Sequence, residues 1–188
     1  FLKHLTSNGE RVPLDFFSWH CYGHLPEKMF NRSVFVRNKL DEYGYTATES
    51  ILNEWNYIKS WDEFVYSVKH IISIKGAAFS AACMCGCQND TAIDMLMYYD
   101  ARPCGYNGLF DYYTYAPLKG YYAFGMFNEL YSLGNACRCT ADNKNIYAAA
   151  AENGSKSAVM ISYYTDDDEC KEKCVVELDF KGGSDTYK

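Results

Sequence analysis

The stretch Ile51-Leu52-Asn53-Glu54-Trp55-Asn56 decides how this chain is interpreted. Its first residues are apolar and predict a short strand that ends in a cluster of polar side chains. A carboxylate between two asparagines and a tryptophan is unusual where packing is the only requirement, because burial of an unpaired carboxylate is costly. Composition alone leaves two equal alternatives for this strand end, a functional site and a structural network of polar groups.

The elements around this strand alternate between strand and helix. Three strands are predicted, at residues 14–22, 50–54 and 93–99. Three helices are predicted after them, at residues 31–43, 61–87 and 117–134. A long loop rich in Tyr and Gly separates the last strand from the last helix. Such alternation is typical of parallel strands covered by helices, so residues 1–134 are expected to form an α/β domain.

The pattern changes after Gly134. Four short strands are predicted, at residues 136–140, 145–151, 156–164 and 174–180. Asn153-Gly154 between two of them is typical of a two-residue hairpin turn. The run 166–168 of three aspartates is interpreted as a solvated loop rather than a calcium site, because no ligand spacing continues from it. Residues 135–188 are therefore predicted to form a second domain, a small antiparallel β-sandwich.

Composition limits the classes of function. The net charge is −6 and no basic stripe is present, which argues against a nucleic-acid partner. No apolar run reaches the roughly 18 residues that a membrane span needs, so no membrane partner is predicted. The chain holds 18 Tyr, 11 Phe and 3 Trp. Most of these are expected to pack the core, but aromatic faces also stack on the C–H faces of sugars. The chain opens at Phe1 with a polar loop, 7–10, and upstream sequence is expected.

The nine cysteines include no C-x-x-C pair. They are interpreted mostly as reduced, buried thiols, which favours a cytoplasmic location, and neither a metal nor a cofactor is predicted. A thiol or metal protein is the third-ranked alternative for function.

The reactive groups of parallel α/β folds gather at the carboxyl ends of the strands. The ends of the three predicted strands supply eight candidate residues: His20, Tyr22, Asn53, Glu54, Trp55, Asn56, Tyr99 and Asp100. Tyr22 and Asn53 could donate hydrogen bonds that keep Glu54 ionised. Trp55 could supply an aromatic wall.

Two of these stretches carry a resemblance. Residues 15–22, Asp-Phe-Phe-Ser-Trp-His-Cys-Tyr, followed by residues 52–56, resemble strands six and seven of glycoside hydrolase family 39. That family belongs to clan A and has β-xylosidase and α-L-iduronidase members. Residues 97–100 then correspond to strand eight. The resemblance implies the C-terminal part of a (β/α)8 TIM barrel, about strands 6–8, followed by the β-sandwich.

The resemblance also implies roles. Glu54 matches the nucleophile of a retaining mechanism, which attacks the anomeric carbon and forms a covalent glycosyl-enzyme. Tyr22 matches the residue that hydrogen-bonds this nucleophile, and His20 matches a residue near the acid/base side of the pocket. The remaining strand-end candidates, Asn53, Trp55, Asn56, Tyr99 and Asp100, are given substrate-contact roles. Clan A enzymes often place a Trp on strand eight, where this chain has Tyr98 and Tyr99.

One part of the expected machinery is absent. A retaining glycosidase needs two carboxyl groups about 5–5.5 Å apart. The acid/base of the family lies in an Asn-Glu-Pro-type motif on strand four, and no such motif occurs here, since Glu27 is followed by Lys28. The chain is therefore interpreted as a fragment that lacks strands one to five, acts on glycosides or oligo- and polysaccharides only in an intact parent, and alone has at most trace turnover.

An alternative keeps the fold and removes the chemistry. A half-barrel without its acid could act as a carbohydrate-binding or packing module, and its open sheet edges could drive homo-oligomerisation. Arg102 and Lys119 near strand eight are interpreted as surface charge rather than as partners of a uronic acid.

Overall fold

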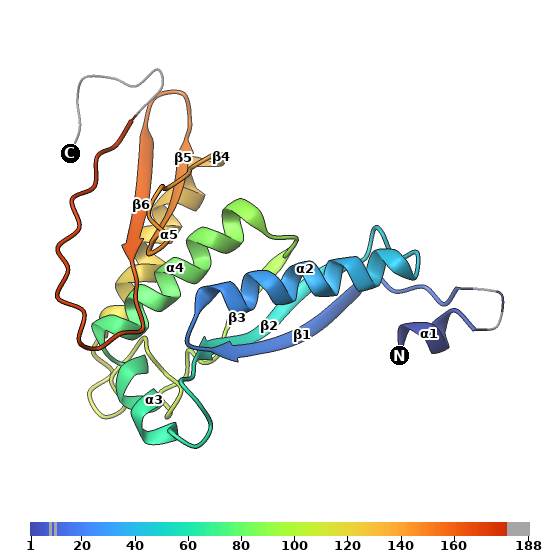
Figure 1. Ribbon diagram of the computed structural model, residues 1–188, viewed down its shortest axis with the longest axis horizontal. Helices are drawn as coiled ribbons and strands as arrows, with labels where there is room; N and C mark the ends of the chain where they lie inside the picture. Colours follow the sequence, from blue (N-terminus) through green and yellow to red (C-terminus); the bar gives the residue numbers. More distant parts are fainter. Residues whose placement is uncertain (8, 10, 180–188) are drawn as a thin grey trace.

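The computed structural model describes residues 1–7, 9 and 11–179 of the chain (Figure 1). Its helices are α1 (Leu2–Leu5), α2 (Pro26–Glu42), α3 (Phe64–Ile71), α4 (Ile74–Asp90) and α5 (Lys119–Leu133). Its strands are β1 (Phe16–Gly23), β2 (Glu49–Tyr57), β3 (Met95–Tyr98), β4 (Asn135–Cys137), β5 (Ile146–Glu152) and β6 (Ser157–Tyr163). Parts of two predicted segments, residues 8, 10 and 180, lie outside the described residues. The short helix α1 was not predicted.

The first sheet is parallel, as the alternation of elements predicted. Its strand order is β1-β2-β3, and both neighbouring pairs run in the same direction. Trp19 lies opposite Leu52 and His20 lies opposite Glu54, so the register passes over Asn53. This irregularity is a bulge that turns the end of β2 relative to its start.

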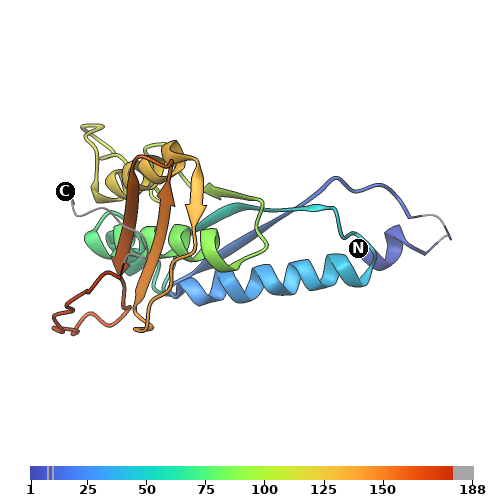
Figure 2. The same cartoon turned by 90° about the horizontal axis from the view of Figure 1, so that it is seen from above.

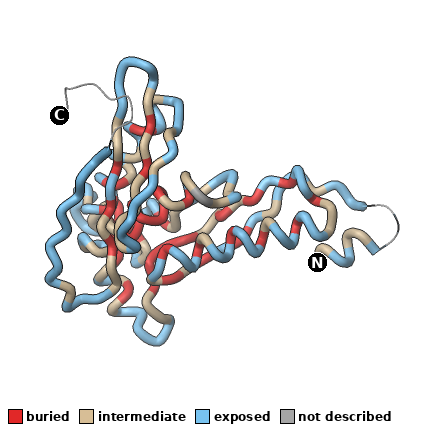
Figure 3. Tube along the Cα trace, turned by 45° about the horizontal axis from the view of Figure 1, so that its top comes forward, coloured by how far each residue is buried: buried red, intermediate tan, exposed pale blue. Residues whose placement is uncertain are grey.

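This parallel sheet has one covered face and one open face. Successive strand residues point to opposite faces, so the aligned row Trp19, Leu52 and Leu96 faces the helices and the row Ser18, Ile51 and Met95 faces away. Three large apolar side chains of the open face are exposed: Phe16 by 56%, Met95 by 46% and Met97 by 42%. Figure 3 shows exposed and buried positions alternating along the arm built by β1, β2 and α2.

Two helix predictions need correction. Helix α2 begins at Pro26, five residues before the predicted start, because proline suits the first position of a helix. The predicted helix 61–87 is two helices, α3 and α4, whose axes differ by 78°. Ser73 caps the second one by accepting a hydrogen bond from the Lys75 amide. Gly76 makes the bend possible, since a Cβ there would lie 2.4 Å from the Ile71 carbonyl oxygen.

Helix α4 is the centre of the core. It lies between the parallel sheet with α2 on one side and the antiparallel sheet on the other (Figure 2). Phe79 of α4 contacts Tyr57 of β2 and Tyr164 after β6, with ring centroids 5.5 and 5.6 Å away. The Ser162 hydroxyl donates to the Ala78 carbonyl over 2.8 Å. One continuous core therefore joins both sheets.

The second sheet is antiparallel, as predicted, with strand order β4-β5-β6. The hairpin around Asn153-Gly154 is present, but its loop has four residues, 153–156, because the Asn153 side chain accepts hydrogen bonds from the amides of Ser155 and Lys156. The predicted strand 174–180 is wrong for residues 174–179, which form no strand. Within the described residues there is one antiparallel sheet packed on α4 and α5, and no second sheet of a sandwich. The division into two domains stays a prediction, and β4 begins at Asn135.

The cysteines follow the prediction in part. Cys21, Cys83, Cys85 and Cys87 are buried, whereas the other five are partly or fully exposed, and all nine are free. Burial raises the pKa of the Cys85 and Cys87 thiols to about 12. Neutral thiols are poor nucleophiles and poor ligands, which weakens the third-ranked alternative. In the part of the chain that the structure describes, no group of three or more His, Cys, Asp or Glu side chains could hold a metal ion.

No single helix among the described residues is long and apolar enough to cross a membrane. The bent pair α3 and α4 would pass that test jointly, by length and composition only.

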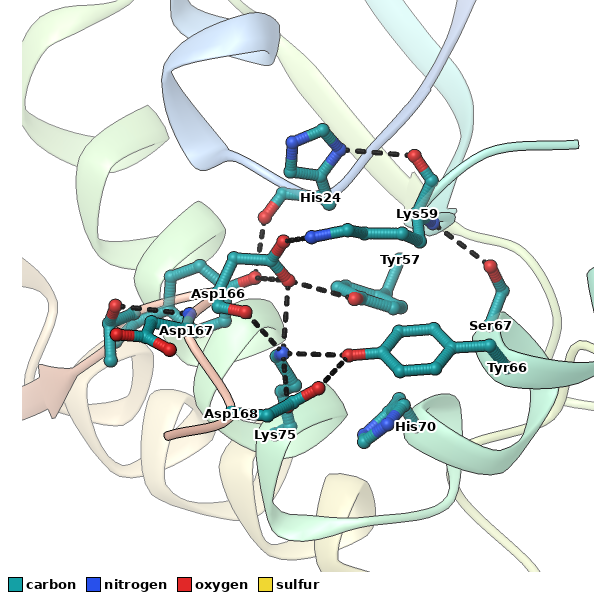
Figure 4. A network of polar contacts seen from close by, with 12 residues as sticks. His24, Tyr57, Lys59, Tyr66, Ser67, His70, Lys75, Asp166, Asp167 and Asp168 are labelled. Carbon is teal, nitrogen blue, oxygen red and sulfur yellow. Dashed lines mark hydrogen bonds and ion pairs between the residues drawn. The ribbon is translucent and has the colours of Figure 1, made fainter. Parts of the chain in front are cut away.

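A polar network centred on Asp166 ties the end of β6 to the end of β2 (Figure 4). The Asp166 carboxylate accepts a hydrogen bond from the Tyr57 hydroxyl over 2.8 Å and pairs with the ammonium groups of Lys59 and Lys75. Lys75 also pairs with Asp168 at 2.7 Å. Burial alone would raise the pKa of Asp166, but the hydrogen bonds from Lys59, Tyr57 and Lys75 hold it below its usual range. The aspartate run is therefore not merely a solvated loop.

Replacing Asp166 by Asn should destabilise the fold. The side chains of Asp166 and Lys75 are each only 10% exposed, and the substitution removes the negative charge that Lys59 and Lys75 share, at a cost of about 3 kcal/mol. Urea unfolding at neutral pH measures this loss. Asp167→Asn is the matched control, because Asp167 is exposed, and it should cost less than about 1 kcal/mol.

The same pair predicts a pH dependence. Because the folded-state pKa of Asp166 is depressed, its stabilisation is present above the unfolded value of about 3.9 and is lost as the pH falls through the folded-state pKa. The difference in free energy of unfolding between the wild type and Asp166→Asn should therefore shrink below about pH 4. A constant difference down to acid pH would contradict the assignment.

Candidate functional site

The ends of β1 and β2 bring three of the predicted residues together. The Tyr22 hydroxyl donates a hydrogen bond to Glu54 Oε2 over 2.9 Å, and His20 Nδ1 lies 3.0 Å from the same oxygen. The Glu54 side chain is 28% exposed and that of His20 is 54% exposed. The parallel pairing explains the arrangement, because it places His20 directly opposite Glu54. The result is a carboxylate held from one side and open to solvent on the other.

Tyr22 is fixed as a hydrogen-bond donor. Burial, the hydrogen bond to Glu54 and the negative charge of that carboxylate all raise the pKa of Tyr22 far above its usual range. The phenol therefore keeps its proton at any ordinary pH. This neutral donor, 2.9 Å from Oε2, holds the Glu54 carboxyl group in a fixed orientation at the strand end.

Trp55 orients Glu54 by occupying the opposite face of the strand. Its ring has no exposed surface and lies between Tyr98 and Phe124, at centroid distances of 5.3 and 6.4 Å. Because neighbouring side chains alternate in direction, a tryptophan anchored in the core directs Glu54 to the open face. The predicted aromatic wall at Trp55 is therefore wrong, and its role is packing.

Asn56 differs from its predicted role in substrate contact, and Asn53 does not make the predicted hydrogen bond to Glu54. The Asn56 side chain is buried and donates to the carbonyl oxygens of Tyr99 and Tyr106, over 2.6 and 2.7 Å. It ties the loop after β3 to β2, which leaves it no part in substrate contact. Asn53 Oδ1 is buried without a hydrogen-bond partner among the described residues, and the hydrogen bond to Glu54 comes from Tyr22 instead. Asn53 lies at the bulge and its predicted role stays a prediction.

Asp100 is engaged with its own loop. It is only 7% exposed and pairs with Arg102, whose Nε donates to Oδ2 over 2.7 Å. The side-chain hydrogen bond from Arg102 holds the pKa of Asp100 below its usual range. Arg102 thus neutralises Asp100. Tyr99, joined to Asp100 by a cis peptide bond, lies with its ring centroid 5.5 Å from that of Tyr106. Of Tyr99 and Asp100, Tyr99 is therefore the residue that lies beside the candidate site.

Sequence reasoning missed a group of aromatic residues beside Glu54. The Trp61 ring meets the Tyr22 ring edge-on with centroids 5.6 Å apart, and the Tyr106 ring lies 6.3 Å from that of Tyr22. The ring centroid of Phe64 lies 5.6 Å from that of Tyr106. We call Tyr22, Trp61, Phe64 and Tyr106 the aromatic rim. Trp61 lies in the loop after β2. Its position shortly after a polar strand end is the sequence feature that could have identified it.

Comparison with known proteins gives structural matches only. No protein-family model and no curated protein matches the sequence. Among solved structures, a glucosidase from Croceicoccus marinus is similar with a TM-score of 0.69 and 25% identity, covering 87% of this chain and 35% of that one. A monomeric β-xylosidase from Caulobacter crescentus CB15 is similar with a TM-score of 0.60 and 17% identity, covering 84% and 35%.

These matches confirm the predicted resemblance to β-xylosidase-like glycosidases at the level of fold. The chain spans about a third of the length of each of these two proteins. A parallel sheet followed by an antiparallel sheet is consistent with part of a barrel joined to a β-domain. The chain is therefore similar in fold to a portion of a glucosidase and of a β-xylosidase.

Proposed function

We propose that this chain supplies the nucleophile side of a retaining glycoside hydrolase of the family 39 type. The observation that carries the proposal is the Glu54 carboxylate, held by Tyr22 and His20 at the carboxyl end of a parallel strand. Two glycosidases with similar folds support the reaction class. Reactive groups in such barrels lie at this end of the strands.

The geometry suits attack on an anomeric carbon. Tyr22 donates a hydrogen bond to Oε2 of Glu54 and His20 Nδ1 lies 3.0 Å from the same oxygen, which leaves the attack to Oε1. A bond from that oxygen to the anomeric carbon forms as the glycosidic C–O bond breaks, and water later cleaves the resulting ester. The hydrogen bond from Tyr22 orients the carboxylate before attack and would stabilise the charge that returns to it when the ester is cleaved.

The reaction also needs an acid for the leaving group, and we propose that it lies outside these 188 residues. Asp100, the other acidic strand-end residue, is paired with Arg102 and does not serve. The open face of the parallel sheet, with Phe16, Met95 and Met97 exposed, would then be covered by further barrel strands that carry the acid.

The nucleophile can be identified by covalent trapping. In the complete barrel, a 2-deoxy-2-fluoro glycoside with a dinitrophenolate leaving group should label the peptide that contains Glu54, because the fluorine slows both steps and the activated leaving group speeds only the formation of the ester. Mass spectrometry of the digested protein locates the label. Glu54→Gln should abolish labelling and lower kcat by a factor on the order of 10⁴. The exposed Glu63, changed to Gln, is the matched control, and a label on any other carboxylate would overturn the assignment.

Tyr22→Phe tests the support of the nucleophile separately from its identity. It removes one hydrogen bond to a charged group while keeping the ring, so kcat/KM of the complete enzyme should fall by about 10- to 150-fold, equivalent to 1.5–3 kcal/mol. Labelling of Glu54 should persist at a lower rate. Unchanged kinetics would show that the hydrogen bond at 2.9 Å has no part in the reaction.

A non-catalytic half-barrel is the second candidate, and the open face favours it. Exposed apolar side chains beside free strand edges promote self-association. The isolated chain should therefore sediment as a dimer or larger species in velocity ultracentrifugation, with the open faces buried against each other. Met97→Lys should shift it toward the monomer. Val34→Lys on the outer side of α2, where Val34 is 48% exposed, should not. A monomeric wild-type chain would refute self-association through the open face.

A further inference from the structure

One side chain of the aromatic rim, that of Trp61, is not packed in the core. Trp61 is 60% exposed, whereas Trp19 is 8% exposed and Trp55 is fully buried. Among the described residues, its one ring contact is the edge-on contact with Tyr22, the residue that donates to Glu54. A large apolar ring is thus presented to solvent directly beside the candidate nucleophile.

The backbone segment that precedes Trp61 is held in place by hydrogen bonds and an ion pair. The Ile58 amide donates to the Gly23 carbonyl over 2.9 Å, so β1 holds the segment from one side. The Lys59 amide donates to the Ser67 hydroxyl over 2.9 Å, and its carbonyl lies 3.2 Å from Nδ1 of His24 (Figure 4). The Lys59 ammonium pairs with Asp166. Ile58 and Lys59, three and two residues before Trp61, are thus held by four groups, so binding at the ring would require little ordering of the loop.

We propose that Trp61 is a sugar-stacking residue that receives the C–H face of a pyranose ring next to the ring held at Glu54. The inference rests on the proposed function of Glu54. The face of an aromatic ring is negative, and the axial C–H groups of a β-pyranoside are weakly positive, so the two attract while water is displaced from both. Apolar walls with a few directed polar groups are the usual composition of small-molecule sites.

A sugar fits this surface better than other planar or apolar partners. Stacking of nucleic-acid bases is accompanied by basic grooves, and this chain has a net charge of −6. The position of Trp61 against Tyr22 makes the surface continuous with a carboxylate rather than isolated. The hydroxyl groups of a bound ring would face the polar side chains of Glu54 and His20.

Fluorescence quenching tests the proposal without turnover. Because the other two tryptophans are buried, acrylamide quenches chiefly Trp61 in the 188-residue chain. At about 100 mM, enough to fill a site with a Kd on the order of 10 mM, methyl β-xyloside and methyl β-glucoside should lower the quenching constant about twofold or more. The open-chain polyol xylitol, which has similar hydroxyls but no ring face, should leave it unchanged.

A second measurement removes the ring. Saturation-transfer NMR should show magnetisation passing from the protein to the C–H protons of methyl β-xyloside, and Trp61→Ala should reduce it several-fold. Tyr131→Ala on α5, where Tyr131 is 80% exposed, is the matched control and should retain the transfer. Circular dichroism establishes that both variants are folded.

The outcomes separate this proposal from that for Glu54. Protection of Trp61 that persists in Glu54→Gln supports sugar stacking even where covalent labelling fails. Labelling at Glu54 without protection of Trp61 by either glycoside overturns the stacking proposal alone. Equal protection by xylitol, or protection that depends on protein concentration and not on sugar, would also overturn it, the latter by assigning Trp61 to contact between two copies of the chain.

Discussion

Burial of helix α4 on two sides is the constraint on which the structure depends. A helix between a parallel sheet with its covering helix and an antiparallel sheet needs small side chains, and α4 is built largely from Ala, Ser, Gly and Cys. Gly86 marks the closest approach, since a Cβ there would lie 2.1 Å from the Phe30 ring of α2. The cysteines of α4 are explained by their size, and their raised pKa follows from the same burial.

The position of α4 determines where β2 ends and what it presents. Tyr57 and Trp55 extend into the core, with Tyr57 against Phe79 of α4, and this anchoring turns Glu54 outward. The Asp166 network then fixes the segment that follows β2 by joining it to the end of β6. Through this network the antiparallel sheet helps to hold the segment that carries Trp61, although the sheet itself does not contact the candidate site.

Sequence reasoning identified the parallel strands and the contact between Tyr22 and Glu54, because both depend on local pattern and on strand order. It failed where a role depends on which face a side chain occupies. Trp55 and Asn56 are adjacent to Glu54 in sequence, yet Trp55 packs against Phe124 in the core and Asn56 is buried by its hydrogen bonds to the loop after β3. The break between α3 and α4 was signalled by Ser73, but helical periodicity continued across it and concealed the bend.

The open face also limits what the site can do electrostatically. The Glu54 side chain is 28% exposed, so water screens its polar contacts, and such contacts are weaker in water than at the lower effective dielectric constant of a covered site. Covering this face would strengthen every polar contact of Glu54 without moving an atom of β1 or β2. Further barrel strands would therefore supply a second carboxyl group and would also exclude the water that weakens the polar contacts of Glu54.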